Sequence, residues 1–207
     1  MSRVAKRPGC EKIAPMPAMT ADENPFAAER AESLAFRFPA GTTWDTLLAR
    51  CAESGWRSAI VGPPGSGKSI LIAQLAPHLE ARGFTPRLFH LGAESRRAHR
   101  DAILAEVRPM RAPDFLLIDG AEQLNTREWL ILRSAIDTLA GCIITQHRTG
   151  RLATVLETGT SPALLEDLAA ELTGGRLPVG EATAIHTRCR GNLRDGLREL
   201  RDRWAGG

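Results

Sequence analysis

The eight residues Gly62–Ser69, with the sequence GPPGSGKS, fit the pattern G-x-x-x-x-G-K-[ST] of a phosphate-binding loop. Glycines in such a loop let the backbone wind around phosphate groups, so that successive N–H groups point inward. Ordinary residue frequencies produce such a match by chance in roughly 1 % of chains of this length. We therefore predict that this segment binds a nucleoside triphosphate.

The side chains of the loop supply what phosphates and a metal ion need. Lys68 would place a positive charge at the β- and γ-phosphates, and Ser69 would offer a hydroxyl to Mg²⁺. The helix expected to begin here presents the positive end of its dipole to the phosphates. The expected cofactors are ATP and Mg²⁺, and the residues assigned to nucleotide binding are Gly62, Pro63, Pro64, Gly65, Ser66, Gly67, Lys68, Ser69 and Ile70.

A carboxylate ends the apolar run FLLID at Asp119. Beside a phosphate loop, an aspartate at the end of a buried strand holds Mg²⁺ directly or through water, so Asp119 and Ser69 are the predicted metal ligands. The next residue is Gly120, where many ATP-hydrolysing P-loop proteins carry a glutamate that orients the attacking water. Glu122 and Glu94 are the candidate catalytic carboxylates, with a surface charge as the alternative for each. Nucleotide binding therefore has more support than hydrolysis.

Polar residues follow another apolar run, in the order Thr145-Gln146-His147-Arg148. A polar group at the tip of that strand would lie near the γ-phosphate, where it can sense the nucleotide or position water. Thr145 is the catalytic candidate, and a polar loop after a buried strand is the alternative. His147 has no partner at metal-ligand spacing, which argues against a metal site there.

Short apolar runs alternate with amphipathic segments over most of the chain. We expect strands at 58–62, 87–91, 115–119, 142–145 and 152–157, and helices at 67–81, 95–107 and 126–139. Continuously apolar strands are typical of parallel sheets that are covered on both faces. The pattern predicts a three-layer α/β/α P-loop NTPase fold with a mainly parallel five-stranded sheet.

The character of the sequence changes near residue 160. Three helices are expected beyond it, at 162–172, 180–190 and 192–204, with no further strand. The expected organisation is a nucleotide-binding core over 24–160 and a small helical lid over 161–207. Residues 1–23 combine basic side chains with prolines and few apolar residues, which indicates a disordered tail.

In order along the chain, GPPGSGKS, LLIDGAEQL, CIITQHR and RGNLRDGLREL resemble the motifs of the AAA+ branch of P-loop ATPases. The resemblance covers residues 58–204 and extends to the small AAA+ ATPases of transposition and replication-initiator systems. The segments NPF, FRFPAGTTW and TQHRTG also resemble uncharacterised bacterial P-loop proteins. The last AAA+ motif is similar to the sensor 2 segment, whose arginine reaches the γ-phosphate from the lid. That role maps onto Arg194, whereas Gly120 departs from the glutamate that is usual in the family.

The residues around Arg194 suit a lid helix without reference to any family. Asn192 can cap the helix N-terminus, and Gly191 permits the turn before it. Arg194 shares a helix face with Arg198 and Arg201, so a solvated basic stripe is the alternative interpretation. The resemblance also makes Arg148 and Arg151 candidates for arginine fingers that act on a neighbouring subunit.

Composition sets broad limits on the function. The net charge of +3 gives no global field towards nucleic acid or membrane, and 43 % hydrophobic residues suffice for a folded core. No apolar stretch reaches the roughly 20 residues needed to cross a bilayer. The four cysteines form no CxxC pair, so neither a zinc site nor a disulfide framework is expected, and a reducing cytoplasm is the expected location.

Three functions fit these features. The first is a slow AAA+-like ATPase that acts as a nucleotide-dependent switch, with an unknown protein partner or self-association. The second is a small-molecule kinase, which we rank lower because a kinase lid normally interrupts the sheet. The third is a nucleic-acid-binding module regulated by ATP, suggested by the basic cluster Arg96, Arg97, His99 and Arg100. A solvated helix face is the alternative for that cluster.

Overall fold

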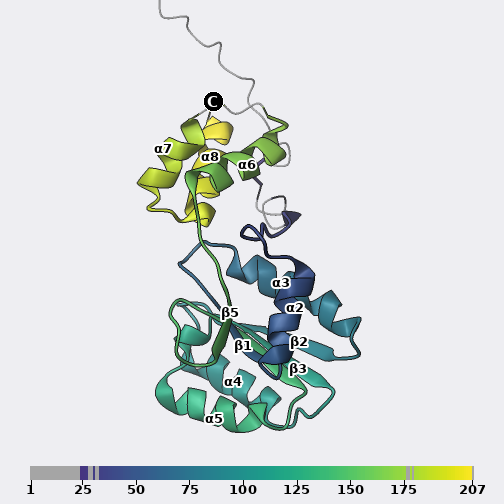
Figure 1. Cartoon of the computed structure of the whole chain (residues 1–207). Coiled ribbons are helices and arrows are strands. Elements are labelled where there is room, and N and C mark those ends of the chain that lie inside the picture. The colour runs from purple at the N-terminus through teal and green to yellow at the C-terminus, as the bar shows by residue number, and fades with distance from the viewer. Residues whose placement is uncertain (1–23, 28–29, 31–32, 176–177, 179, 207) are drawn as a thin grey trace, which may run out of the picture.

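The computed structural model describes residues 24–27, 30, 33–175, 178 and 180–206 of the chain. The tail expected over residues 1–23 lies outside these described residues. Figure 1 shows a larger lobe that contains the sheet and a smaller lobe of helices, joined by an extended segment after the last strand.

The larger lobe is built on a five-stranded sheet in the order β2-β3-β4-β1-β5. All neighbouring strands are parallel, so their carboxyl ends meet at one edge of the sheet. This confirms the predicted α/β/α P-loop fold with a parallel five-stranded sheet. The strands are β1 (Arg57–Val61), β2 (Thr85–His90), β3 (Asp114–Asp119), β4 (Gly141–Gln146) and β5 (Ala153–Glu157).

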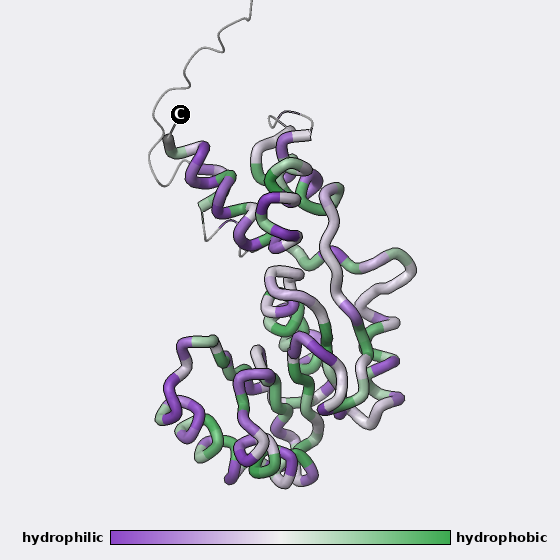
Figure 2. Tube along the Cα trace, turned by 90° about the vertical axis from the view of Figure 1, so that its left-hand side faces the viewer, coloured by the Kyte–Doolittle hydropathy of each residue, from purple (hydrophilic) through white to green (hydrophobic). Residues whose placement is uncertain are grey.

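Helices cover both faces of the sheet and create two apolar layers. On one face, α2 (Trp44–Glu53) and α3 (Lys68–Glu80) pack against one set of strand residues. On the other face, α4 (Arg97–Val107) and α5 (Thr126–Ile136) pack against the alternate set. All six residues of β4 are buried, and Figure 2 shows hydrophobic segments running through the centre of this lobe. The central strands therefore provide a rigid base for the residues at their carboxyl ends.

One helix of the core is not expected from the sequence pattern. No element is predicted before residue 58, yet α2 lies there and buries Leu47, Leu48 and Cys51. Its start is fixed by a capping box, in which Thr43 and Thr46 bond to each other's backbone N–H groups. The threonine pair is a weaker sequence signal than the usual Ser/Thr with Glu/Gln, which explains why the helix start is not predicted.

The smaller lobe contains α6 (Pro162–Thr173), α7 (Glu181–Arg188) and α8 (Leu193–Gly206) around an apolar cluster of its own. Sequence order groups Phe26 and Leu34 with the nucleotide-binding core, whereas their side chains are buried in the helical lobe. Phe26 meets Trp204 edge to face at 5.5 Å, and the Asn24 amide donates to the carbonyl of Arg201. Two segments of the chain therefore contribute to the helical lobe: one contains Phe26 and Leu34, and the other contains α6, α7 and α8. The predicted boundaries of core and lid remain predictions.

Within the part of the chain that the structure describes, no helix combines the length and the apolar character that a bilayer crossing requires.

Candidate nucleotide-binding site

The phosphate loop connects β1, which ends at Val61, with α3, which begins at Lys68. Gly67 caps α3 in the left-handed conformation, with φ of 84°. The Lys68 side chain is buried, and its Nζ donates to the carbonyls of Gly62 at 2.7 Å and Pro63 at 2.8 Å. The ammonium group thus lies inside the curve of the loop, where the phosphates of a nucleotide would bind.

Charges from three other elements act on the Lys68 ammonium. Burial lowers the pKa of Lys68, the carboxylates of Glu122 and Asp119 raise it, and the guanidinium of Arg194 lowers it again. The charged groups that affect the pKa of Lys68 come from the end of β3, the following turn and α8. All three are sequence-predicted site residues.

Asp119 is held in place by hydrogen bonds at the end of β3. Its Oδ1 accepts from the hydroxyl of Thr145 at 2.6 Å, and that hydroxyl accepts from the N–H of Gly120 at 2.8 Å. Its Oδ2 lies 3.3 Å from Nδ1 of His90 on the edge strand. Thr145, a catalytic candidate from the sequence, therefore orients Asp119 in this arrangement. His90 is a neighbour that the sequence pattern does not single out.

The donors at this edge of the sheet suit magnesium. Mg²⁺ prefers oxygen ligands and usually binds through one or two carboxylates together with phosphate oxygens and water. The Ser69 hydroxyl and the Asp119 carboxylate are donors of this kind, and the phosphate loop lies beside them. Among the described residues, no group of three or more His, Cys, Asp or Glu side chains could hold a metal alone. The Ser69 hydroxyl and the Asp119 carboxylate fit a metal ion that also takes phosphate oxygens as ligands.

Gly120 has a structural reason to be glycine. Its φ is 87°, and a Cβ at this position would lie 2.1 Å from the backbone carbonyl oxygen of Leu91. A side chain is excluded here by both the left-handed backbone and the adjacent end of β2. The chain then turns through the 3₁₀ helix η2 (Ala121–Gln123), which carries Glu122. The backbone at position 120 therefore leaves no room for the glutamate that is usual in AAA+ proteins.

The two sequence-predicted glutamates lie in different surroundings. Glu122 is paired through Oε1 with Nε2 of His147 at 3.2 Å, while its Oε2 is buried without a hydrogen-bond partner among the described residues. Glu94 is exposed on the turn after β2, and its carboxylate lies over Gly92, where an added Cβ would come within 2.3 Å of it. Only Glu122 is among the charges that act on Lys68.

A cavity of about 340 Å³ opens beside Glu122. The side chain of Gln146, which ends β4, is 2 % exposed, and its Nε2 has no partner among the described residues. The sequence pattern placed Gln146 at the strand tip but gave no reason to prefer it over Thr145. The residues that line the cavity are Glu122, Gln146, His147, Arg148, Thr149 and Arg151.

The helical lobe contacts the phosphate loop directly at the start of α8. A Cβ on Gly65, whose φ is 73°, would lie 1.8 Å from Oδ1 of Asn192. The same Oδ1 accepts from the N–H of Asp195 at 3.3 Å, as expected for a helix cap. Arg194, two residues after Asn192, is therefore carried to the nucleotide site by this contact. Arg198, one turn further on, is paired instead with Asp195 at 3.7 Å.

Comparison with solved structures supports the fold. Thermotoga maritima RuvB, described as a Holliday junction branch migration motor, matches with a TM-score of 0.52 and 22 % identity over 75 % of this chain and 58 % of its own. The replication initiator DnaA, bound to AMPPCP and single-stranded DNA, matches with a TM-score of 0.55 and 16 % identity, again over 75 % and 58 %. Both neighbours are AAA+ P-loop ATPases. The chain has the AAA+ fold.

The likeness concerns the fold, because the sequence identities are low. The chain spans less than three fifths of the length of either neighbour. No protein-family model matches the sequence, and no curated protein matches it either. The resemblance expected from the ordered motifs is thus confirmed at the level of the AAA+ fold.

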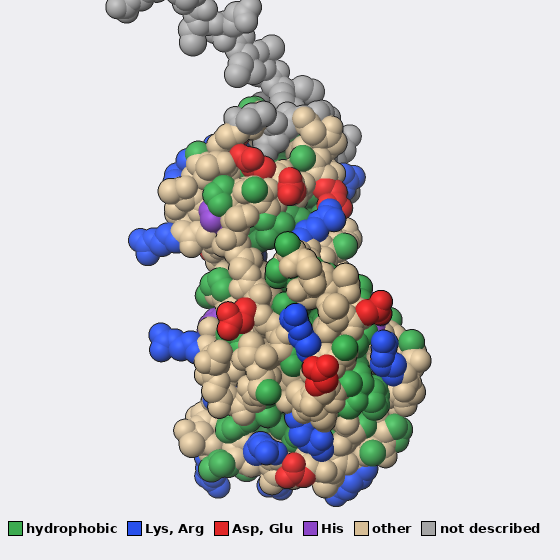
Figure 3. Space-filling model, viewed as in Figure 1, with side chains coloured by type: hydrophobic (Ala, Val, Ile, Leu, Met, Phe, Trp, Pro, Cys, Tyr) green, Lys and Arg blue, Asp and Glu red, His purple; other side chains and the backbone are tan. Residues whose placement is uncertain are grey.

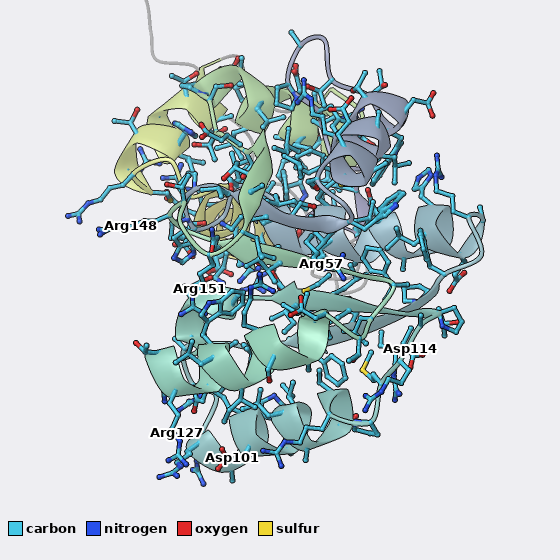
Figure 4. The ribbon with its side chains drawn as sticks, turned by 60° about the horizontal axis from the view of Figure 1, so that its bottom comes forward. Arg57, Asp101, Asp114, Arg127, Arg148 and Arg151 are labelled. Carbon is cyan, nitrogen blue, oxygen red and sulfur yellow. The ribbon has the colours of Figure 1, made fainter. Side chains whose placement is uncertain are left out.

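The two arginine-finger candidates differ in their contacts and in their exposure to solvent. Arg151 donates to the carbonyls of Ala121 at 2.6 Å and Leu124 at 2.5 Å, and its guanidinium lies 4.9 Å from the ring centre of Trp129. These contacts hold η2 and α5 together within one chain. Arg148 is exposed at the rim of the cavity, and Figure 4 shows both arginines on the same side of the molecule. Only Arg148 has the exposure that a finger in trans needs.

Two threonines connect the larger lobe to the helical lobe. The sequence pattern does not single them out. The Thr158 hydroxyl lies 2.6 Å from the hydroxyl of Ser66 in the phosphate loop, and its N–H donates to Val61. The Thr160 hydroxyl lies 3.3 Å from Nε2 of His186 in α7. The extended segment after β5 is thus tied to the loop at one end and to the lobe at the other. Figure 3 shows the narrow waist that this segment crosses.

A second segment missed by sequence reasoning lies against the phosphate loop. The Gln74 side chain accepts from the N–H of Phe36 at 3.0 Å and donates to the carbonyl of Leu34 at 3.0 Å. The Phe36 ring thereby comes within 3.2 Å of the position that a Cβ on Gly67 would occupy. The aromatic ring of Phe36 therefore lies beside the phosphate loop at the start of α3.

Within the basic cluster at the start of α4, Arg100 is half-buried, whereas Arg96, Arg97 and His99 are exposed. Arg100 donates to the buried carboxylate of Glu128 at 3.0 and 3.1 Å and to the carbonyl of Ser95. Arg97 pairs with Asp101 at 3.5 Å. The contacts of Arg100 therefore favour a structural role for that residue, and the choice between a solvated helix face and a nucleic-acid surface concerns the three exposed residues.

Proposed function

We propose that this protein binds ATP with Mg²⁺ and acts as a slow ATPase whose helical lobe responds to the bound nucleotide. The observation that carries the proposal is the buried Lys68 ammonium, which donates to the Gly62 and Pro63 carbonyls inside the phosphate loop. The charges of Asp119, Glu122 and Arg194 act on its pKa. A buried ammonium next to carboxylates and a guanidinium is suited to bind a polyanion together with a cation.

Each residue has a distinct task in this proposal. Lys68 would exchange its hydrogen bonds with the Gly62 and Pro63 carbonyls for the β- and γ-phosphate oxygens. Ser69 and Asp119 would hold Mg²⁺, with Thr145 fixing the orientation of the Asp119 carboxylate. The metal ion, when bound, would neutralise charge on the phosphates.

The response of the lobe follows from its two links to the phosphate loop. Asn192 touches Gly65, and Thr158 bonds to Ser66, so a change in the loop reaches the lobe at both points. Arg194 would add a contact that exists only when a γ-phosphate is present. ATP and ADP would therefore favour different positions of the lobe, which is the requirement for a ligand-driven switch.

Replacement of Lys68 by alanine tests the binding step. Loss of a charge at the β- and γ-phosphates predicts at least a tenfold lower affinity for MgATP, measured by titration calorimetry. Arg82→Ala, which removes an exposed positive charge in the turn after α3, is the matched control and is expected to bind like the wild type. A Lys68→Ala variant that is folded and binds MgATP with unchanged affinity would refute the assignment of the phosphate loop.

A further inference from the structure

Two buried polar atoms without a partner among the described residues belong to side chains of the same cavity. They are Oε2 of Glu122 and Nε2 of Gln146, which come from η2 and from the end of β4. Buried polar groups are nearly always hydrogen-bonded, so a pair of exceptions in one place requires an explanation. Catalytic sites are among the places where such exceptions occur, because their groups are reserved for a ligand.

The two atoms are chemically complementary towards water. A side-chain amide nitrogen can only donate, and an ionised carboxylate oxygen can only accept. A water molecule that reached both atoms would accept from Gln146 and donate to Glu122. The bond between Glu122 Oε1 and Nε2 of His147 at 3.2 Å fixes the carboxylate, which leaves Oε2 for the water. The arrangement thus has an acceptor for a proton and a donor that orients the oxygen.

The cavity is adjacent to the place expected for the γ-phosphate. Gln146 pairs with Val61 in the sheet, and its carbonyl accepts from the N–H of Gly62, the first residue of the phosphate loop, at 3.2 Å. In the proposed function, this loop binds the phosphates of ATP. A water held by Gln146 and Glu122 would accordingly lie beside the loop.

Other carboxylates are less suited to activate this water. Both oxygens of Asp119 are engaged, one by Thr145 and one by His90, and the residue is needed for Mg²⁺. Position 120 cannot carry a side chain, because a Cβ there would overlap the carbonyl of Leu91. Glu94 is exposed and lies over Gly92, outside the residues that line the cavity.

We propose that Glu122 is the general base of ATP hydrolysis and that Gln146 positions the attacking water. This inference rests on the proposed function and names the group that the glycine at position 120 leaves unassigned. The water oxygen forms a bond to the γ-phosphorus while the bond from that phosphorus to the bridging oxygen breaks. The bridging oxygen leaves with the electron pair as part of ADP, and Glu122 Oε2 takes the proton of the water. The products are ADP and inorganic phosphate, and the proton passes from Glu122 to solvent.

The test uses the full chain with MgATP in single-turnover hydrolysis and in titration calorimetry. Glu122→Gln keeps the shape of the side chain and is expected to lower the hydrolysis rate at least about a hundredfold, the usual range for loss of a general base. Gln146→Met removes the amide at similar volume and is expected to lower kcat about tenfold. The Kd for MgATP should stay within about twofold in both variants. A purely structural role would instead change binding and unfolding together.

Glu94→Gln is the matched comparison, since it removes a carboxylate at the same edge of the sheet. A loss of turnover in Glu94→Gln, or unchanged turnover in Glu122→Gln, would overturn the assignment of Glu122. If the wild type binds MgATP but hydrolyses none above the rate in buffer, the catalytic inference fails while the proposed binding stands. If the wild type binds no MgATP, both fail.

Discussion

The sheet lobe and the helical lobe differ in how they hold their parts of the site. In the sheet lobe, Lys68 and Asp119 are attached to α3 and β3, which are packed between two large apolar layers. In the helical lobe, Arg194 stands on α8, which is anchored in one smaller cluster that includes Phe26 from the start of the described chain. The sheet lobe is therefore suited to fixed geometry, and the helical lobe to a movable contact.

The connection between the lobes lies at the phosphate loop. Asn192 approaches Gly65, and the segment after β5 is tied through Thr158 to Ser66 and through Thr160 to His186. Under the proposed function, nucleotide binding and the response of the helical lobe can be tested by different substitutions. Substitutions in the sheet lobe should affect folding or phosphate binding, whereas those in α8 and the connecting segment should affect discrimination between nucleotides.

The largest effect is expected from placing the glutamate usual in AAA+ proteins at position 120. Gly120→Glu would force a side chain into a left-handed conformation and against the Leu91 carbonyl, so we expect the free energy of unfolding to fall by about 2–6 kcal/mol. Denaturant titration measures this loss, and ATPase turnover should not rise. Gly159→Ala is the control, because nothing lies within 4 Å of a Cβ there. A stable, faster Gly120→Glu enzyme would contradict this view of the sheet lobe.

Arg194 provides the next largest test, now in the helical lobe. A charge-assisted bond to the γ-phosphate contributes roughly 1.5–3 kcal/mol, so Arg194→Ala should weaken ATP binding about ten- to a hundredfold and leave ADP binding nearly unchanged. Calorimetric titration with each nucleotide measures the difference. Arg198→Ala, which removes a partner of Asp195 on the same helix, is the control for lost surface charge. Equal losses for ATP and ADP, or equal behaviour of the two variants, would leave Arg194 as part of a basic stripe.

The smallest effect is expected at the link between the lobes. Thr158→Val removes the hydroxyl that lies 2.6 Å from the Ser66 hydroxyl and should lower the free energy of unfolding by about 0.5–1.5 kcal/mol. The same change should reduce the ATP-dependent protection of α6–α8 in hydrogen exchange. Thr160→Val breaks the contact with His186 and tests the other end of the segment. Unaltered protection in both variants would show that the lobe responds through Asn192 and Arg194 alone.

Most of the fold was accessible from local sequence patterns. The five strands, the order of strands and helices and the phosphate loop depend on apolar runs, glycines and caps that act over a few residues. The capping of α8 by Asn192 is local in the same way. Helix α2 escaped this reasoning because its threonine capping box is an unusual signal and its apolar face becomes evident only against the sheet.

The division of tasks among the site residues depended on tertiary structure. The sequence alone identified Lys68, Asp119 and Arg194 as candidates, because each belongs to a short contiguous motif with a recognisable chemical role. It left Glu122 and Glu94 equivalent, and it offered no reason for the glycine at position 120. The structure separates them, because the carbonyl of Leu91 excludes a side chain at 120 and only Glu122 shares a cavity with Gln146. Which residues share the site depends on which strand ends lie next to each other, and the long-range packing of the sheet sets that order.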